Sequence, residues 1–168
     1  MPLSFVRLAI GWWILVPLSV LVHELGHFLP VWIAGCSVEL RFALIPHVVW
    51  PVCSTEVDAL ARAGGPLASL LLPVVGACVQ AKWRQAGVLL SELGLFLPVT
   101  AALSLLLGFA HGHWLATAAL AVAGLALAAL SLLREPDRRP VVLALVVGMP
   151  AGTLSWCLAG WLLSGVVL

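Results

Sequence analysis

Two histidines and a glutamate near the end of the first apolar stretch have the types and spacing needed to hold a metal ion. The residues His23-Glu24-Leu25-Gly26-His27 match the pattern H-E-x-x-H. On a helix, side chains four positions apart project from one face, so the imidazoles of His23 and His27 can bind one Zn²⁺. Glu24 can then take a proton from a zinc-activated water and pass it to a leaving amine. This pattern indicates hydrolytic zinc chemistry.

The alternative is that His23, Glu24 and His27 are unrelated polar residues with no shared function, and their place in the chain disfavours it. A charged side chain at the centre of a membrane span costs ~2.5–3.5 kcal/mol on insertion scales. The motif lies inside a long apolar stretch. A functional role for the motif therefore explains these residues better than chance does.

A hydrolytic zinc site needs a third protein ligand and leaves a fourth position for water. We expect His111 to supply that ligand, with His113 as the alternative, because both lie where the third apolar segment ends. That end is on the same side of the membrane as His23 and His27. The turn containing His111 and His113 could equally be a hydrated loop at the membrane surface. Three weaker candidates lie in the first connection: Asp58, Glu56 and His47.

The composition predicts that most of the chain lies in a lipid bilayer. Hydrophobic residues make up 63% of the 168 residues and charged residues only 9%, against about 25% charged residues in soluble domains. The length fits about five spans of ~20 residues, and we expect one integral-membrane domain over residues 1–168. A net charge of +1 gives no electrostatic reason to bind nucleic acid, so that class of partner is excluded.

Five apolar segments predict an all-α membrane protein with about five transmembrane helices. The first segment is too long for the apolar core of a signal peptide and lacks a cleavage pattern, so we interpret it as a retained span. The segments cover residues 6–29, 65–81, 86–109, 114–133 and 141–167.

The first connection, residues 31–64, is the longest and predicts a short β-hairpin-like segment. Residues 37–42 partly alternate between polar and apolar side chains, and residues 47–50 could form the return strand. Cys36 and Cys53 lie in the same connection and could be bridged in an oxidising compartment. We favour small buried thiols for the four cysteines instead.

Five spans in series place alternate connections on opposite faces of the membrane. Six basic residues fall on the face where the chain starts, and the positive-inside rule predicts that this face is cytoplasmic. The H-E-x-x-H end would then face outward. These basic residues are Arg7, Lys82, Arg84, Arg134, Arg138 and Arg139. The same topology disfavours three acidic residues as zinc ligands, because they lie at or near the basic face: Glu92, Glu135 and Asp137.

The segment Gly64-Gly65-Pro66 opens the second apolar span. Two residues without side chains let this span approach another backbone closely, and Pro66 suits the first turn of a helix. The segment is either an ordinary close-packed helix start or a floor of the site that contacts the substrate backbone.

Three segments carry a resemblance to a known family. The first is His23–His27 within an apolar span, followed by a strand-like segment. The second is residues 63–69, Ala-Gly-Gly-Pro-Leu-Ala-Ser, similar to a G-P-x-x-N signature, and the third is residues 93–98, similar to an N-x-x-P segment. On these residues, which touch roughly the first two thirds of the chain, the sequence resembles the site-2 protease family, the intramembrane zinc metalloproteases.

The resemblance implies an endopeptidase that cuts membrane-protein segments, with one Zn²⁺ as its cofactor and Glu24 as its general base. The chain departs from the family pattern in having no asparagine, so Ser69 and Leu95 stand at the two Asn positions. It also has no L-D-G motif, and His111 would replace the family's aspartate ligand. The family usually holds its zinc nearer the cytosolic face, which conflicts with the count of basic residues.

Three functions follow from these observations. The first is an intramembrane zinc endopeptidase with a membrane-protein substrate, in a multi-pass protein of the lipid bilayer. The second is a proteolytically inactive relative that binds or chaperones membrane proteins, favoured by the missing L-D-G. The third is a small transporter that uses Glu24 and Glu92 as a proton relay. The arginine-rich, asparagine-free composition suggests a G+C-rich gene and so a bacterial cell membrane.

Overall fold

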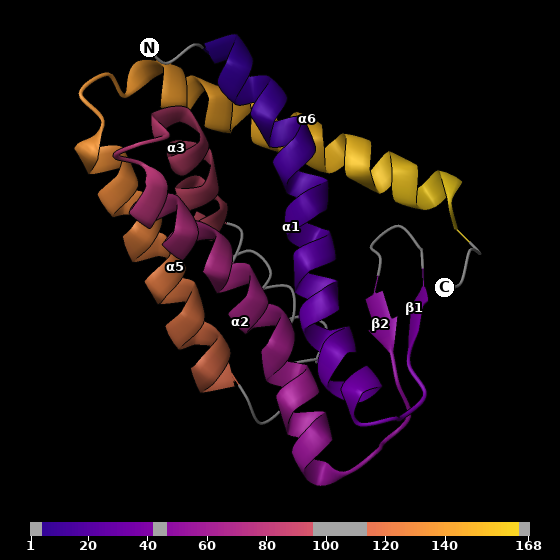
Figure 1. The fold of residues 1–168 in the computed structure, drawn as a ribbon. Coiled ribbons are helices and arrows are strands. Elements are labelled where there is room, and N and C mark those ends of the chain that lie inside the picture. Colours follow the sequence, from indigo (N-terminus) through magenta and orange to yellow (C-terminus); the bar gives the residue numbers. More distant parts are fainter. Residues whose placement is uncertain (1–4, 42–46, 96–113, 165–168) are drawn as a thin grey trace.

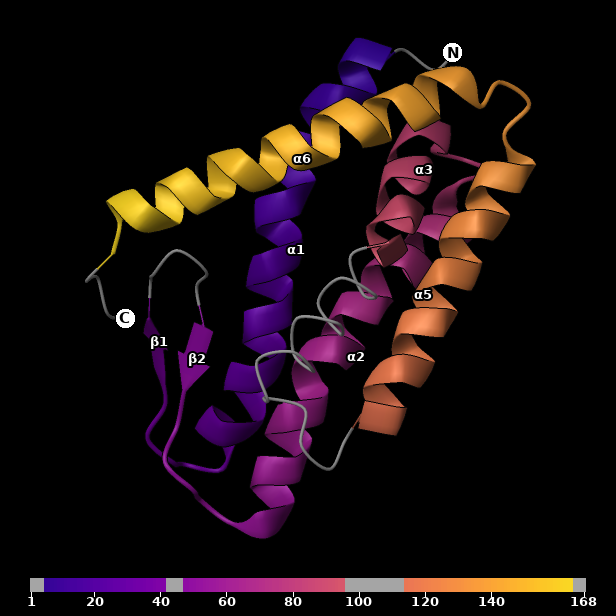
Figure 2. The same ribbon diagram turned by 180° about the vertical axis from the view of Figure 1, so that it is seen from behind.

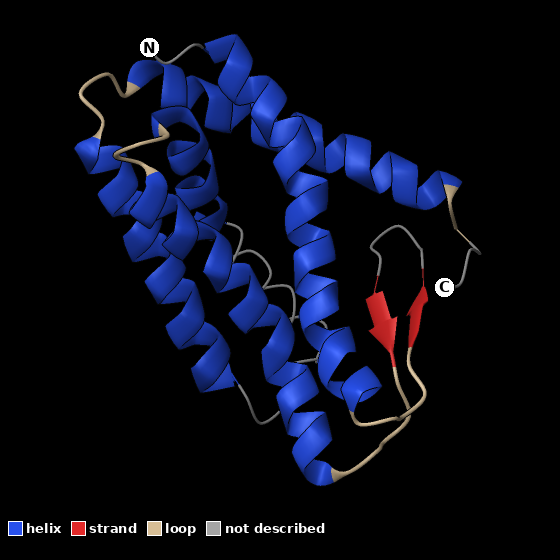
Figure 3. Ribbon diagram, viewed as in Figure 1, coloured by secondary structure: helices blue, strands red, loops and turns tan. Residues whose placement is uncertain are grey.

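The computed structural model describes residues 5–41, 47–95 and 114–164. It is an all-α fold with one short antiparallel hairpin, which confirms the predicted fold class (Figures 1 and 3). The elements in chain order are α1 (Phe5–Ile33), β1 (Glu39–Arg41), β2 (His47–Val49), α2 (Thr55–Val79), α3 (Arg84–Glu92), the 3-10 turn η1 (Leu93–Leu95), α5 (Trp114–Arg134) and α6 (Arg139–Leu162).

Three of the described helices are long and apolar enough to cross a membrane: α1, α2 and α6. The helices α1, α2 and α5 run side by side, whereas α6 crosses the N-terminal half of α1 obliquely (Figures 1 and 2). At the crossing, a Cβ atom built on Gly152 of α6 would lie 3.0 Å from the Trp12 carbonyl oxygen. Glycine therefore allows α6 to approach the backbone of α1 closely.

Apolar side chains fill the contact between α1, α3 and α6 and also cover much of the outer surface. The buried cluster contains Leu8, Trp12, Val16, Val88, Leu89, Leu93, Val141 and Ala144. On the outer surface, Ile14, Leu71 and Val146 are each more than 60% exposed. Because such a surface is unfavourable in water, it fits helices that face lipid.

The start of α2 differs from the sequence prediction. The helix begins at Thr55, ten residues before the predicted start at residue 65. The Ser54 side chain accepts a hydrogen bond from the Val57 N–H and caps the helix, and the acidic residues Glu56 and Asp58 lie in the first turn. Polar residues that resemble a loop thus form a capped helical extension, because acidic side chains are favourable at a helix N-terminus.

The third predicted span, residues 86–109, is only partly described. The helix α3 and the turn η1 cover its beginning, and residues 96–109 lie outside the described part of the chain. The fourth and fifth predicted segments correspond to α5 and α6.

The second and fourth predicted connections meet at one end of the molecule, as the topology predicted. Glu135 is only 3% exposed. It accepts hydrogen bonds from the Arg84 guanidinium at 2.5 and 2.7 Å and from the Gln80 amide at 3.0 Å. These contacts raise the pKa of Arg84 above its usual value. The ion pair joins the start of α3 to the end of α5.

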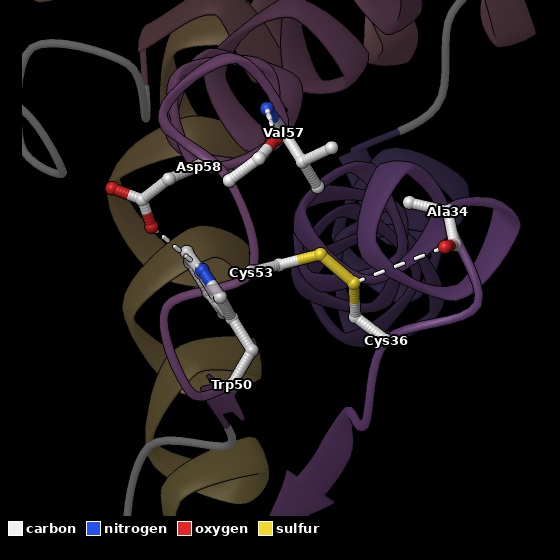
Figure 4. Close-up of a disulfide and its surroundings, with 7 residues drawn as sticks. Ala34, Cys36, Trp50, Cys53, Val57 and Asp58 are labelled. Atoms are coloured by element: carbon white, nitrogen blue, oxygen red, sulfur yellow. Dashed lines mark hydrogen bonds between the residues drawn. A yellow bond between two sulfur atoms is a disulfide. The ribbon is translucent and has the colours of Figure 1, made fainter.

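The predicted hairpin is present over the described residues. The strands β1 and β2 are antiparallel, with Glu39 opposite Val49 and Arg41 opposite His47. Because the two strands are antiparallel, the residues before β1 and after β2 lie close together. The Cα atoms of Cys36 and Cys53 are 6.1 Å apart, and the two residues form a disulfide (Figure 4). The preference for four small buried thiols was therefore wrong.

Candidate metal centre

The imidazole rings of His23 and His27 converge on one side of α1. Their Nε2 atoms lie 3.1 Å apart, and the rings meet edge to face with centroids 4.8 Å apart. A tetrahedral zinc with Zn–N bonds of about 2.0–2.1 Å holds two ligand nitrogens about 3.3 Å apart. The two histidines thus lie at the separation that a shared zinc requires.

The Nδ1 atom of each ring lies within hydrogen-bond distance of a residue of helix α2. The Nδ1 atom of His23 lies 2.8 Å from the Ser69 hydroxyl oxygen, and Nδ1 of His27 lies 2.6 Å from the Ala61 carbonyl oxygen. A carbonyl oxygen only accepts hydrogen bonds, so Nδ1 of His27 carries the proton and its Nε2 presents a lone pair. The Ser69 hydroxyl can accept a hydrogen bond from His23 in the same way. Such partners on the second ring nitrogen are typical of metal-ligating histidines.

The close approach of α2 to the histidines depends on glycines. A Cβ atom on Gly64 would overlap the Gly26 carbonyl oxygen, and a Cβ atom on Gly65 would overlap the His27 ring. The predicted close approach of the Gly64-Gly65-Pro66 segment to another backbone is therefore present, and its partner is α1. Pro66 lies inside α2 and not at its first turn, because the helix starts earlier than predicted.

Glu24 is buried, with 8% of its surface exposed, and its carboxylate reaches the hairpin. The Glu24 Oε2 atom accepts a hydrogen bond of 2.9 Å from the backbone N–H of Val48 in β2. The strand β2 therefore fixes one carboxylate oxygen of Glu24, the residue that follows His23 in the sequence. This contact satisfies a buried acceptor that would otherwise be costly.

The preferred third ligand, His111, and its alternative, His113, lie outside the described residues. Within the described ranges, no group of three or more His, Cys, Asp or Glu side chains is placed to hold a metal ion. Of the weaker candidates, Asp58 accepts hydrogen bonds from the Trp50 indole at 2.9 Å and from Arg62 at 2.8 Å. The other two candidates, Glu56 and His47, have exposed side chains.

Like the contacts that α2 makes with the two histidines, two contacts from residues 47–50 could not be identified from the sequence. The indole of Trp50 stacks on the His27 ring, with centroids 6.0 Å apart and planes inclined by 25°. The second is the hydrogen bond from the Val48 N–H to Glu24. Both residues lie in the predicted return strand, and that position was the only signal. The side chains of α1 that Val48 and Trp50 contact depend on how the hairpin packs against that helix, which the sequence pattern does not show.

No protein-family model, curated protein or solved structure matches this chain. The function is therefore inferred from the residues of the site and their geometry.

Proposed function

We propose that the protein is an intramembrane zinc endopeptidase. The observation that carries this proposal is the 3.1 Å separation of the His23 and His27 Nε2 atoms, with each Nδ1 atom held by α2. Two neutral imidazoles arranged in this way present two lone pairs to one point. Charge and polarity of this kind within an apolar helix are typical of functional sites.

The residues divide the work of peptide-bond hydrolysis among them. His23, His27 and His111 would hold the metal, with His113 as the alternative third ligand. When bound there, zinc would supply a Lewis acid that polarises the attacking water and the peptide carbonyl. Glu24 acts as the general base, takes the proton of the attacking water and passes it to the leaving amine. Gly64, Gly65 and Pro66 form the floor of the site beneath the extended substrate.

The substrate is a segment of a membrane protein. The site lies in α1, a helix long and apolar enough to span a bilayer, in a multi-pass protein of a bacterial cell membrane. A helical segment hides its amide bonds, so it must unwind before it is cut. The strands of the hairpin offer an edge on which an extended chain can pair.

The hairpin end of the molecule faces the outside of the cell in this proposal. Two independent observations support that orientation. In the predicted five-span topology, six basic residues fall on the face opposite the H-E-x-x-H end, as the positive-inside rule requires of a cytoplasmic face. The Cys36–Cys53 disulfide lies at the hairpin end, and disulfides persist in oxidising compartments.

Replacing Glu24 by Gln tests the mechanism. The purified protein is reconstituted into liposomes with a panel of fluorescently tagged single-span peptides, and cleavage is followed by mass spectrometry. Loss of a general base lowers rates by about 10²–10⁴-fold, so Glu24→Gln should keep its zinc and lose cleavage. The exposed Asp137, between α5 and α6, gives the matched control, and Asp137→Asn should cleave at the wild-type rate. An active Glu24→Gln enzyme would show that the mechanism is wrong.

A second function is favoured by the missing L-D-G motif. An inactive relative would bind or chaperone membrane proteins without cutting them. It predicts a wild-type protein that binds no zinc, or one that binds zinc and cuts none of the peptides. Zinc content and cleavage, measured on one preparation, separate the two functions.

A further inference from the structure

The segment made of β2 and the loop that follows it, residues 47–53, contacts the candidate metal centre and is anchored beside it. Val48 donates its N–H to Glu24 at 2.9 Å, and the Trp50 indole stacks on the His27 ring. Cys53 ends the segment and is bonded to Cys36, three residues beyond the end of α1. The segment is thus attached to α1 at Glu24 and His27 and, through the disulfide, to the chain just beyond the end of that helix.

Trp50 is held in place by the first turns of α2. Its indole N–H donates to Asp58 at 2.9 Å (Figure 4). Asp58 in turn pairs with Arg62 at 2.8 Å. The indole has one hydrogen-bond donor, and its bond to Asp58 restrains the orientation of the ring. The ring fixed in this way lies nearly parallel to the imidazole of His27 and limits its rotation.

The same segment orients the proposed general base. A carboxylate can turn about its last side-chain bond unless one oxygen is held. The Val48 N–H holds Oε2 of Glu24, and Val48 is itself buried, with 8% of its surface exposed. The strand can keep this position only while the hairpin stays against α1, and the disulfide ties the end of the segment to the end of that helix.

We propose that residues 47–53 form a disulfide-anchored cap, in which Trp50 positions His27 and the Val48 N–H positions Glu24. Trp50 and Val48 are positioning residues, because they act through the histidine and the glutamate. The role of the cap in metal binding rests on the proposed zinc site. The covering of the His27 ring by Trp50 does not, because it follows from the stacking contact between the two rings alone.

Two measurements on the full-length, detergent-solubilised protein test the cap. The first is zinc affinity by competition with a chromophoric chelator. Partners that orient metal-ligating histidines typically contribute about 10–100-fold to affinity, so Trp50→Ala should weaken zinc binding by about 10-fold. Trp50→Phe keeps an aromatic ring and should retain most of the affinity. Trp83→Ala is the matched control, because Trp83 is 60% exposed and lies between α2 and α3.

The second measurement is the rate at which diethyl pyrocarbonate modifies His27 in the zinc-free protein, determined by peptide mass spectrometry. Trp50→Ala and the double variant Cys36→Ser/Cys53→Ser should each raise this rate several-fold. N-acetylhistidine added to the same reaction is the internal reference, because His47 itself belongs to the cap. The double variant Cys78→Ser/Cys157→Ser is the control for loss of thiols, because these two cysteines are free.

The two measurements separate failure of the cap from failure of the proposed function. If the wild-type protein binds no zinc, the proposed function fails, and the modification rates alone decide whether the cap exists. Unchanged His27 modification in both test variants would overturn the cap. Faster modification with unchanged zinc affinity would overturn its positioning role.

Discussion

The Ser69 hydroxyl oxygen of α2 lies 2.8 Å from Nδ1 of His23. This contact joins the second apolar helix to the H-E-x-x-H motif across 46 positions of sequence. A hydroxyl can both donate and accept, so it can hold the His23 tautomer in which Nε2 is free to bind a metal.

Replacing Ser69 by alanine should weaken zinc binding by about 10-fold or more, because the outer partner of His23 is lost. Ser69→Thr keeps the hydroxyl and should bind zinc nearly as the wild type does. Ser19→Ala is a matched control in α1, where the hydroxyl bonds the Val16 carbonyl of its own helix. Chelator competition measures all three affinities. Equal zinc affinities for Ser69→Ala and Ser19→Ala would show that Ser69 does not support zinc binding by His23.

Replacing Gly65 by alanine should displace the His27 imidazole. The added Cβ atom would lie 2.7 Å from Cδ2 of the ring and closer still to Nε2. Overpacking of this kind typically costs about 1–3 kcal/mol, and here it falls on a proposed metal ligand. We expect lower zinc affinity in a protein that still elutes as a monodisperse peak on size exclusion. Leu67→Ala, at a position 52% exposed on the same helix, should leave the affinity unchanged. Wild-type zinc binding by Gly65→Ala would contradict this packing.

Glu92 distinguishes the protease from the transporter. Its side chain is 3% exposed, and Oε1 has no hydrogen-bond partner among the described residues. An unpaired buried carboxyl destabilises a fold, and an apolar replacement of similar shape is often neutral or stabilising. Glu92→Met should therefore melt at the same temperature as the wild type or higher, with unchanged cleavage. Loss of function at wild-type stability would instead favour a proton relay through Glu92.

The local features of the fold and site were predictable from the sequence, because they depend on spacing along one element. His23 and His27 converge because residues four apart share a helix face, and the hairpin followed from the partial alternation of polar and apolar residues over 37–42. The start of α2 at Thr55 was missed, because its first turns carry polar residues that resemble a loop. Contacts between elements were also missed. Trp50 meets His27, and the Ala61 carbonyl meets its Nδ1 atom, only through the packing of the hairpin and α2 on α1.

Zinc content tests the central claim most directly. The protein, purified without added chelator or metal, is analysed by inductively coupled plasma mass spectrometry beside His23→Ala, His27→Ala and the control Ile14→Ala, at a position of α1 that is 64% exposed. We predict about one zinc ion per wild-type chain and per Ile14→Ala chain, and loss of most of the zinc in the other two variants, because each removes one of three ligands. A wild-type protein without zinc, or one that keeps its zinc in both His23→Ala and His27→Ala, would contradict the proposed metal centre.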